Sequence, residues 1–211
     1  MSRRRQEPAP RQDRPLLNAG ARPMGREASQ VEPEILTQRL SLSRLTESDA
    51  HTMYGYRRDP EVCRYQSFEP ESLEDVEKFI ASLQSNAFDT PGLWFQFAIR
   101  IKETGLLVGD LGTHVLVGDP RQTEIGFTLA PAFQGRGYAT EAVTGILSYL
   151  FGPIHKHRVF ASVDPRNAPS IALLERVGMR KEAHFRKSLW FKGEWVDDMV
   201  FGILESEWMG R

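Results

Sequence analysis

The sequence predicts an α/β (α+β) domain built on a single mixed, partly parallel twisted sheet of about seven strands flanked by about four helices. Three observations indicate this fold. Two β-rich runs are joined by a short glycine-containing loop, an apolar-periodic helix follows a strand directly, and Arg158–Val163 is a largely apolar run after that helix. Such a run is typical of a buried strand with a parallel neighbour, and mixed strand and helix order of this kind favours one layered α/β domain.

The length and composition limit the size and number of the domains that the chain can form. A chain of 211 residues with 40% hydrophobic content can bury one sizeable core. We expect a disordered basic tail over residues 1–33 and an N-terminal domain boundary at residue 34, with the domain extending to residue 211. The net charge of −1 hides an asymmetry, because residues 1–30 carry a surplus of four positive charges. This segment has too little apolar surface to offset the entropy of ordering it.

The sequence leaves the role of this tail open. Arg3-Arg4-Arg5 is similar to the start of a twin-arginine export signal, but no apolar segment follows it. A basic arm can contact RNA or an acidic surface, while a solvated extension, or a true start at Met24, is the favoured interpretation. No apolar run approaches the roughly 18 residues of a membrane span, so we expect a cytoplasmic protein with no membrane partner.

The elements of the first half follow in order. Thr37–Leu45 is predicted as a strand, and Thr46-Glu-Ser-Asp49 opens a helix toward Tyr56 because it supplies a capping residue and early acids. Asp59-Pro60 interrupts that helix. The remaining expected elements are a helix from Glu71 or Asp75 to about Ser85, strands at Trp94–Ile101 and Leu106–Leu116 joined by a loop at Lys102–Gly105, and a strand at Thr123–Leu129.

The second half begins with the best-supported helix. From Ala139 to Phe151 apolar residues recur at spacings of three and four, and Gly152-Pro153 ends the run. After the strand at Arg158–Val163, Pro169 suits a first helical turn, so a helix begins around Ala168. Two strands, at about Arg180–Lys187 and Trp195–Leu204, are expected to turn at Phe191–Gly193.

The segment Gln134-Gly-Arg-Gly-Tyr-Ala139 lies between the strand and the helix and predicts a phosphate site. Its glycines allow the main chain to approach a ligand closely, and the N–H groups of a helix N-terminus favour an anion such as pyrophosphate. Arg136 adds a cation. A Walker loop would need Lys where Tyr138 stands, and a dinucleotide fingerprint would need Gly where Thr140 stands. The plain alternative is a strand-to-helix turn without a ligand.

With these residues the chain resembles the GNAT superfamily of acyl-CoA-dependent N-acetyltransferases, whose loop reads Gln/Arg-x-x-Gly-x-Gly/Ala. Four further segments resemble the first strand, fourth strand, Asn-x-x-Ser helix and final hairpin of the branch containing the ribosomal-protein N-terminal acetyltransferases. These are Thr37–Leu45, Glu124–Phe127, Asp164–Met179 and Lys192–Asp198. The resemblance covers roughly residues 35–208. It implies an enzyme that transfers an acetyl group from acetyl-CoA to a primary amine.

The resemblance also implies where acetyl-CoA is held. The cofactor-binding candidates are Phe127, Thr128, Leu129, Gln134, Gly135, Arg136, Gly137, Tyr138, Ala139, Thr140, Asn167 and Ser170. Ser170 matches a serine near the thioester sulfur and is a candidate catalytic residue for the leaving thiolate. The tyrosine that many other members use falls at Leu174. Asn167 and Ser170 are otherwise an ordinary helix cap and an ordinary first-turn serine.

Acetyl transfer also needs a base, since the attacking amine must lose its proton. Glu124 is the catalytic candidate because it lies on the strand beside the thioester, and a merely solvated carboxylate is the alternative. The glutamate that some ribosomal-protein acetyltransferases use falls near Leu189. Glu194 and Trp195, near the last hairpin, are candidate substrate-binding residues.

The remaining expectations concern mechanism and partners. Cys63 is the sole cysteine, and the five histidines have no companions at ligand spacing, so we expect no metal site and direct attack of the amine in a ternary complex. The acceptor is a protein N-terminus, ribosomal or other, or a small-molecule amine. The alternative function is a non-catalytic acyl-CoA-binding module whose basic arm contacts RNA or a protein partner. The sequence leaves open whether the chain forms a homodimer.

Overall fold

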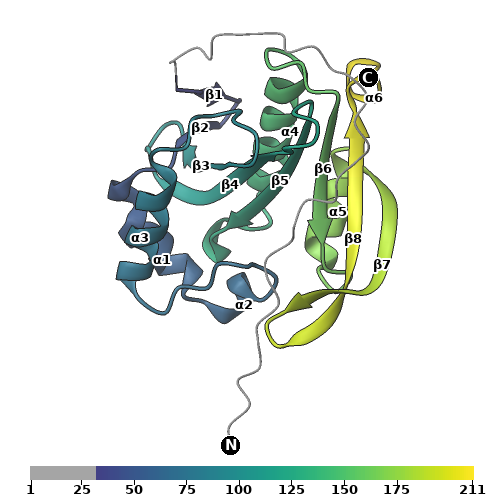
Figure 1. The fold of residues 1–211 in the computed structure, drawn as a ribbon. Coiled ribbons are helices and arrows are strands. Elements are labelled where there is room, and N and C mark those ends of the chain that lie inside the picture. The colour runs from purple at the N-terminus through teal and green to yellow at the C-terminus, as the bar shows by residue number, and fades with distance from the viewer. Residues whose placement is uncertain (1–31) are drawn as a thin grey trace, which may run out of the picture.

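The computed structural model describes residues 32–211, so nearly all of the tail predicted for residues 1–33 lies outside the described residues. Within them, eight strands form one sheet (Figure 1). In spatial order they are β1 (Ile35–Leu36), β2 (Leu40–Arg44), β3 (Trp94–Ile101), β4 (Leu107–Val115), β5 (Gln122–Leu129), β6 (Arg158–Val163), β8 (Glu194–Leu204) and β7 (Arg180–Phe191). The sheet is mixed, because β5 and β6 pair in parallel and the other neighbours pair antiparallel.

Helices cover both faces of this sheet. They are α1 (Ala50–Arg57), α2 (Pro60–Cys63), α3 (Leu73–Leu83), α4 (Tyr138–Phe151), α5 (Ala168–Arg176) and α6 (Glu205–Met209), with short 3-10 turns at Glu47–Asp49 and Pro131–Phe133. Capping residues in the sequence determine where some of these helices begin. The Ser72 hydroxyl accepts from the Asp75 amide, and the Asp75 carboxylate accepts from the Ser72 amide, which closes a capping box at α3.

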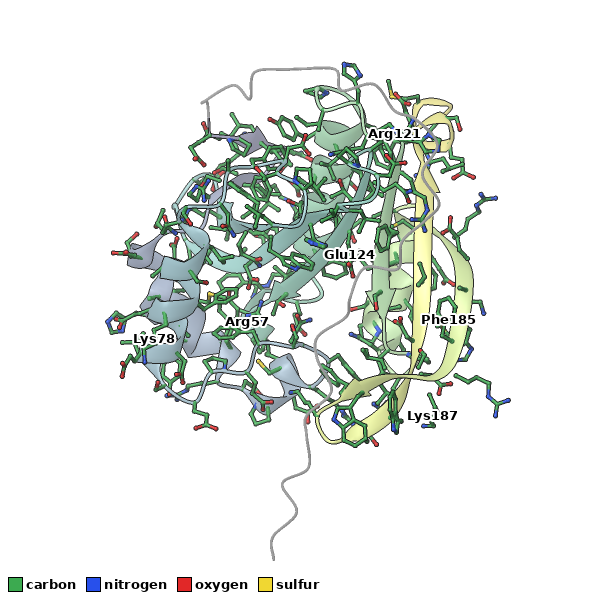
Figure 2. The ribbon with its side chains drawn as sticks, in the orientation of Figure 1. Arg57, Lys78, Arg121, Glu124, Phe185 and Lys187 are labelled. Atoms are coloured by element: carbon green, nitrogen blue, oxygen red, sulfur yellow. The ribbon has the colours of Figure 1, made fainter. Side chains whose placement is uncertain are left out.

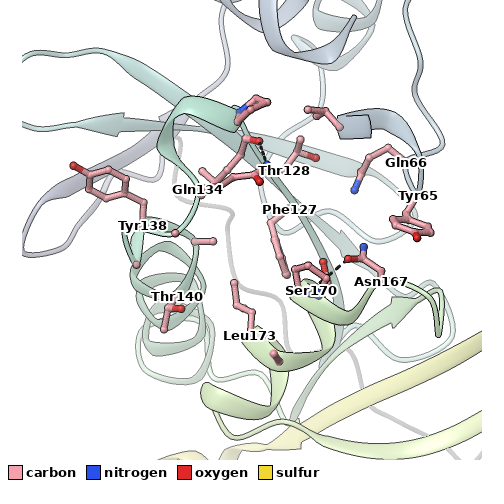
Figure 3. Close-up of a pocket in the computed structure, with 18 of the residues that line it drawn as sticks. Tyr65, Gln66, Phe127, Thr128, Gln134, Tyr138, Thr140, Asn167, Ser170 and Leu173 are labelled. Atoms are coloured by element: carbon pink, nitrogen blue, oxygen red, sulfur yellow. Dashed lines mark hydrogen bonds between the residues drawn. The ribbon is translucent and has the colours of Figure 1, made fainter. Parts of the chain in front are cut away.

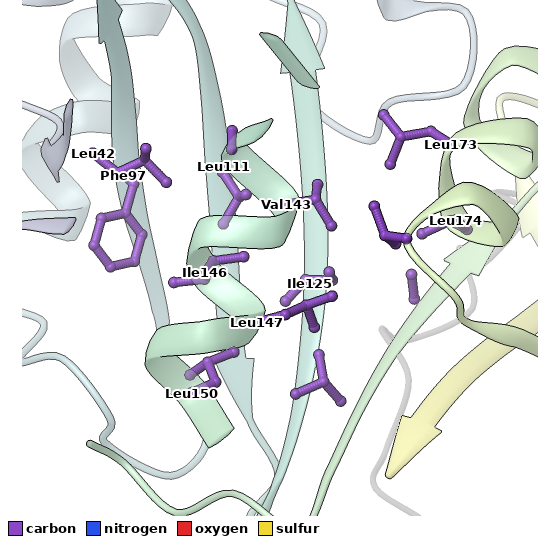
Figure 4. Packing of buried hydrophobic residues seen from close by; sticks show 14 of the residues in the cluster. Leu42, Phe97, Leu111, Ile125, Val143, Ile146, Leu147, Leu150, Leu173 and Leu174 are labelled. Atoms are coloured by element: carbon purple, nitrogen blue, oxygen red, sulfur yellow. The ribbon is translucent and has the colours of Figure 1, made fainter. Parts of the chain in front are cut away.

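Strand alternation divides the core into two clusters. Phe97, Leu111 and Ile125 point to the face covered by α4, whose Ile146 and Leu147 are fully buried against them (Figure 4). Ala98 points to the opposite face and packs in the cluster that α1 and α3 complete. Burying one large aliphatic side chain stabilises a fold by roughly 1.5–3 kcal/mol, so the α4 face supplies much of the stability.

The sheet opens between β5 and β6. The two strands pair only through Gln122–Glu124 and Arg158–Phe160, so the second half of β5 has no partner on that side. In Figure 1 the two strands diverge below this pairing. Beyond the opening, the chain continues from β5 into α4 and from β6 into α5, so the N-termini of both helices flank the gap. The opening therefore places helix starts beside unpaired strand backbone.

The structure confirms the predicted mixed fold and refines its elements. The strands at Trp94–Ile101 and Arg158–Val163 have the predicted bounds. The sheet has one strand more than the predicted seven, because Ile35–Leu36 forms a short additional strand that pairs with β2. The strand predicted at Thr37–Leu45 is β2 and spans only Leu40–Arg44. The strand expected to end at Lys187 continues to Phe191, across a register shift between Phe185 and Leu189. Pro60, expected only to interrupt a helix, also starts a short one whose cap is Asp59.

Two further features of the described residues bear on function. Over residues 32–211, no helix combines the length and apolarity that crossing a membrane requires. In the same part of the chain, no group of three or more His, Cys, Asp or Glu side chains is arranged to hold a metal ion.

Candidate active site

The glycine loop forms the N-terminus of α4. Gly135 and Gly137 both adopt positive φ, at 72° and 80°, and Gly137 is the residue that caps the helix. A Cβ on Gly135 would meet no atom within 4 Å, so this side of the loop is open. The N–H groups of residues 137–140 precede the first helical hydrogen bond, which Glu141 donates to Gly137, and they donate to no backbone carbonyl within residues 32–211. Free N–H groups at a helix N-terminus are suited to bind an anion, and we call residues 135–140 the cradle.

Glu141 anchors this cradle to the rest of the sheet. Its carboxylate accepts from the Thr37 hydroxyl at 2.7 Å and from the backbone and side chain of Arg39 at 2.6 Å each. Arg39 also donates to the Arg136 carbonyl at 3.1 Å. Burial by itself would raise the pKa of Glu141, but the hydrogen bonds from Thr37 and Arg39 outweigh it and hold that pKa below its ordinary value.

A cavity of about 1240 Å³ extends from the cradle across the opening of the sheet (Figure 3). Its volume exceeds the roughly 300–1,000 Å³ of a common ligand pocket. The predicted cofactor residues that line it are Phe127, Thr128, Leu129, Gln134, Gly135, Gly137, Tyr138, Ala139, Thr140, Asn167 and Ser170. The structure thus brings together residues from β5, α4 and α5 that lie up to about forty positions apart in the sequence, which suits an extended ligand with an anionic end.

Two loop side chains differ from their expected arrangement. Gln134 lines the cavity, but its side-chain amide donates to the Leu129 carbonyl at 3.1 Å and so fixes the loop to the strand end. Arg136 does not line the cavity, and its guanidinium lies over the Phe133 ring instead. Arg176, at the end of α5, lines the cavity and donates to the Thr140 hydroxyl at 3.3 Å. It therefore places a cation beside the cradle.

Asn167 and Ser170 lie at the start of α5 on the far side of the opening. The Asn167 side-chain oxygen accepts from the Ser170 amide at 3.3 Å, which makes Asn167 the cap of this helix. Both side chains line the cavity. Tyr65 closes this end, since its hydroxyl donates to the Arg166 carbonyl at 3.3 Å. The Ser170 hydroxyl thus lies on the wall opposite the part of β5 that has no strand partner on the β6 side.

A second, smaller cavity of about 220 Å³ lies on the α1 and α3 face of the sheet, and we call it the sheet-face pocket. It shares Gln66, Phe127 and Thr128 with the large cavity. Its other lining residues are Arg57, Ser67, Phe68, Phe79, Leu83, Trp94, Gln96, Asp110, Gly112 and Gly126. The two cavities therefore meet at the same two residues of β5.

A buried ion pair forms one wall of the sheet-face pocket (Figure 2 labels Arg57). Arg57, 4% exposed, donates to Asp110, which is fully buried, at 2.5 Å. Tyr56 and Gln96 donate to the same carboxylate at 2.6 and 2.5 Å. Burial raises the pKa of Tyr56 well above its ordinary value, and the Asp110 charge adds to this effect. Burial alone would lower the pKa of Arg57, but Asp110 outweighs it and raises that pKa.

Besides Arg136, three predicted residues lie outside both cavities. Glu124 is on β5, on the same face as Gly126 and Thr128, with its carboxylate 4.0 Å from the His114 ring (Figure 2). Glu194 accepts from Arg166 at 3.0 Å. Trp195 is half exposed and contacts the Trp190 ring edge to face. Any part that these three take in the reaction therefore requires water or a substrate that extends beyond the cavities.

Sequence reasoning missed the residues that reach the site from α1, α2 and the following loop. Tyr65 and Gln66 line the large cavity, and the Arg57–Asp110 pair lines the small one. Arg57 and Asp110 are 53 positions apart, so no local spacing connects them. The available signal was Asp110 itself, a carboxylate in the middle of a largely apolar strand, because a buried charge requires a partner.

The comparisons with known proteins agree with this geometry. The sequence profile of the acetyltransferase (GNAT) domain matches residues 39–180. The chain is 32% identical over 174 residues to the uncharacterized N-acetyltransferase YnaD of Bacillus subtilis, which covers 82% of this chain and 98% of that protein. It is 27% identical over 124 residues to the [ribosomal protein uS5]-alanine N-acetyltransferase of Escherichia coli, or 58% of this chain and 64% of that one.

A solved structure extends the likeness to the whole domain. Mycobacterium smegmatis RimJ in complex with CoA-disulfide matches with a TM-score of 0.74 and 25% identity, over 83% of this chain and 89% of that one. The chain therefore belongs to the GNAT family and is an acetyltransferase, and the proteins it resembles include ribosomal-protein acetyltransferases. The family uses acetyl-CoA, and the cradle, the cavity and Arg176 fit such a ligand.

Proposed function

We propose that this enzyme transfers an acetyl group from acetyl-CoA to a primary amine by direct attack in a ternary complex. One observation carries the proposal: the open cradle at the start of α4 continues into a cavity that meets the sheet-face pocket at Phe127 and Thr128. A donor bound along the first cavity and an acceptor in the second would come together at that junction. Holding two reactants in place in this way removes much of the entropic barrier to transfer.

Acetyl-CoA supplies the acetyl group as a thioester, and the residues of the chain hold and orient it. The N–H groups of residues 137–140 would bind the pyrophosphate, with Arg176 adding a positive charge. The segment Phe127–Leu129, which has no strand partner on the β6 side, would bind the arm that leads to the thioester. Ser170 would donate a proton to the departing thiolate from the opposite wall.

We keep Glu124 as the candidate base. It faces the same side of the sheet as Thr128 but lies four residues away along β5 and lines neither cavity. The amine proton would therefore reach it through water rather than directly. A covalent route through cysteine is disfavoured, because the only cysteine, Cys63, is buried and burial raises its pKa.

The acceptor is proposed as a protein N-terminus or a small-molecule amine, and the single cysteine favours a reducing compartment such as the cytoplasm. The test is release of free CoA from acetyl-CoA in the presence of N-terminal peptides, amino acids, amino-acid amides and polyamines. Acetylation of at least one class supports the proposal. Tight CoA binding without transfer to any amine would instead indicate a binding module.

A further inference from the structure

The sheet-face pocket has an open position in its floor because β5 carries glycine at Gly126. The register across β3, β4 and β5 aligns three rows of side chains on this face of the sheet. The rows are Ala98–Asp110–Thr128, Gln96–Gly112–Gly126 and Trp94–His114–Glu124. In the middle row, a Cβ on Gly126 would meet no atom within 4 Å. The floor of the pocket is thus an empty side-chain position.

The walls of the pocket are apolar on one side. Phe68 and Phe79 stack with ring centroids 4.2 Å apart, and Leu83 of α3 continues this wall. The volume of about 220 Å³ corresponds to roughly seven water molecules at about 30 Å³ each, which suits a group of the size of one amino-acid residue. The pocket therefore fits a small group with an apolar part.

The polar side of the pocket offers hydrogen-bond donors. The Arg57 Nε and the Thr128 hydroxyl are buried and have no hydrogen-bond partner among the described residues, although both residues line the pocket. A buried donor without a partner destabilises the protein unless a ligand or water satisfies it. An oxygen atom of a bound molecule would supply the acceptor that the Arg57 guanidinium lacks.

The same wall offers no free anion. Among residues 32–211, Asp110 is the only carboxylate that lines the pocket, and its two oxygens already accept from Tyr56, Arg57 and Gln96. The charges of Arg57 and Asp110 also offset each other. A second ammonium group on the acceptor would therefore lose its hydration in the pocket without gaining a counter-charge.

We propose, on the basis of the function proposed above, that the sheet-face pocket binds the acceptor and selects amines that carry an oxygen acceptor next to the amine-bearing carbon. Both the carboxylate of a free amino acid and the first carbonyl of a peptide provide this oxygen. Arg57 recognises it, Phe68 and Phe79 contact the side chain, and polyamines are rejected.

The test compares acceptors with and without this oxygen, and each rate is expressed per unprotonated amine because an adjacent carbonyl lowers the pKa of the amine. Leucine, leucinamide and 3-methylbutylamine share a side chain, a leucine-initiated tripeptide distinguishes a peptide from a free amino acid, and spermidine represents polyamines. We expect kcat/KM for leucine, leucinamide or the tripeptide to exceed that for 3-methylbutylamine and spermidine by about tenfold or more, as a hydrogen bond to a charged group provides. Equal or better use of 3-methylbutylamine or spermidine would overturn the inference and leave the proposed function intact.

Two variants test the residues. Arg57→Lys keeps a positive charge opposite Asp110 but removes the Nε donor, so the preference for leucinamide over 3-methylbutylamine should fall by about tenfold while CoA affinity is unchanged. Gly126→Val fills the empty floor position and should abolish acetylation without weakening CoA binding. Gly118→Val is the matched control, since Gly118 is exposed, has an open Cβ position and lines neither cavity.

The outcomes separate the two proposals. A folded Gly126→Val enzyme with wild-type turnover would show that the acceptor does not bind in the sheet-face pocket, even though acetyl transfer itself is intact. An Arg57→Lys enzyme that folds and retains the full preference would remove Arg57 from acceptor recognition. If no amine is acetylated by the wild-type protein while CoA binds, the proposed function fails, and the inference fails with it.

Discussion

Among single side chains, Glu141 connects the cradle to the sheet through three hydrogen bonds. Because its pKa is lowered in the folded state, it stabilises the fold above its unfolded pKa, near 4.5, and this stabilisation is lost as the pH falls through the folded pKa. Glu141→Gln should therefore lower the free energy of unfolding by about 1.5–3 kcal/mol at neutral pH, the range for hydrogen bonds to charged groups.

Urea unfolding across a pH series measures this effect. The difference between the wild-type protein and Glu141→Gln should be greatest above about pH 5 and should shrink in more acidic buffer. Glu103→Gln, on an exposed loop, is the control and should show no such dependence. A difference that stays constant with pH would mean that the Glu141 charge contributes nothing to the anchor.

Glu124 is a second residue whose role can be tested directly. If Glu124 is the base, Glu124→Gln removes the proton acceptor but keeps the shape, so turnover should fall by roughly 10²-fold with CoA affinity preserved. The defect should shrink as the pH rises, because a deprotonated amine no longer needs a base. Ser170→Ala should slow the reaction without that recovery. Wild-type turnover of Glu124→Gln at every pH would exclude Glu124 from the mechanism.

Among the elements, the start of α4 is the most sensitive to substitution. Gly137 adopts a φ of 80°, and the Arg39 guanidinium lies 3.4 Å from the position of its missing Cβ. Gly137→Val would strain this turn and crowd the cradle, so CoA affinity should fall by about tenfold or more. Isothermal titration calorimetry on the folded variant measures this. Unchanged affinity would show that CoA does not bind at this loop.

The sequence predicted elements well where local patterns determine them. The glycine turn before α4, α4 itself and β6 depend on glycine positions and apolar periodicity that lie within about fifteen consecutive residues, and each was found near its predicted place. The short strand β1 and the extension of β7 depend instead on pairing with another strand. Pairing is a non-local interaction, so no periodicity within those segments could indicate it.

The same distinction applies to the site. The loop residues other than Arg136 share one cavity with Ser170, because each lies next to a helix start that the sequence marks with glycine or proline. The sheet-face pocket was not predicted, because it arises from the register of three strands and from Arg57 of a helix far away in the chain. The floor of this pocket is the open Cβ position of Gly126, and a glycine within a strand does not indicate which side chains lie opposite it.

Considered together, the helices and strands form two halves on either side of the opening between β5 and β6, with the large cavity lined from both halves. One core cluster nevertheless extends across both, since Ile125 of β5 and Leu174 of α5 belong to it. Because this core is shared, we expect the domain to unfold in a single cooperative transition. A ligand that contacts both walls of the cavity then stabilises the complete domain rather than one half.

This arrangement gives the last prediction. CoA at about 100 times its dissociation constant should add about 2.7 kcal/mol to the stability of the native state, which for a domain of this size corresponds to a rise in Tm of about 5–10 °C. Differential scanning calorimetry with increasing CoA measures the shift, and Gly137→Val at the same CoA concentration should show a much smaller one. Two separate transitions, of which CoA moves only one, would show that the halves unfold independently and that the cavity does not join them. A single transition whose Tm does not change with added CoA would mean that the native protein does not bind CoA.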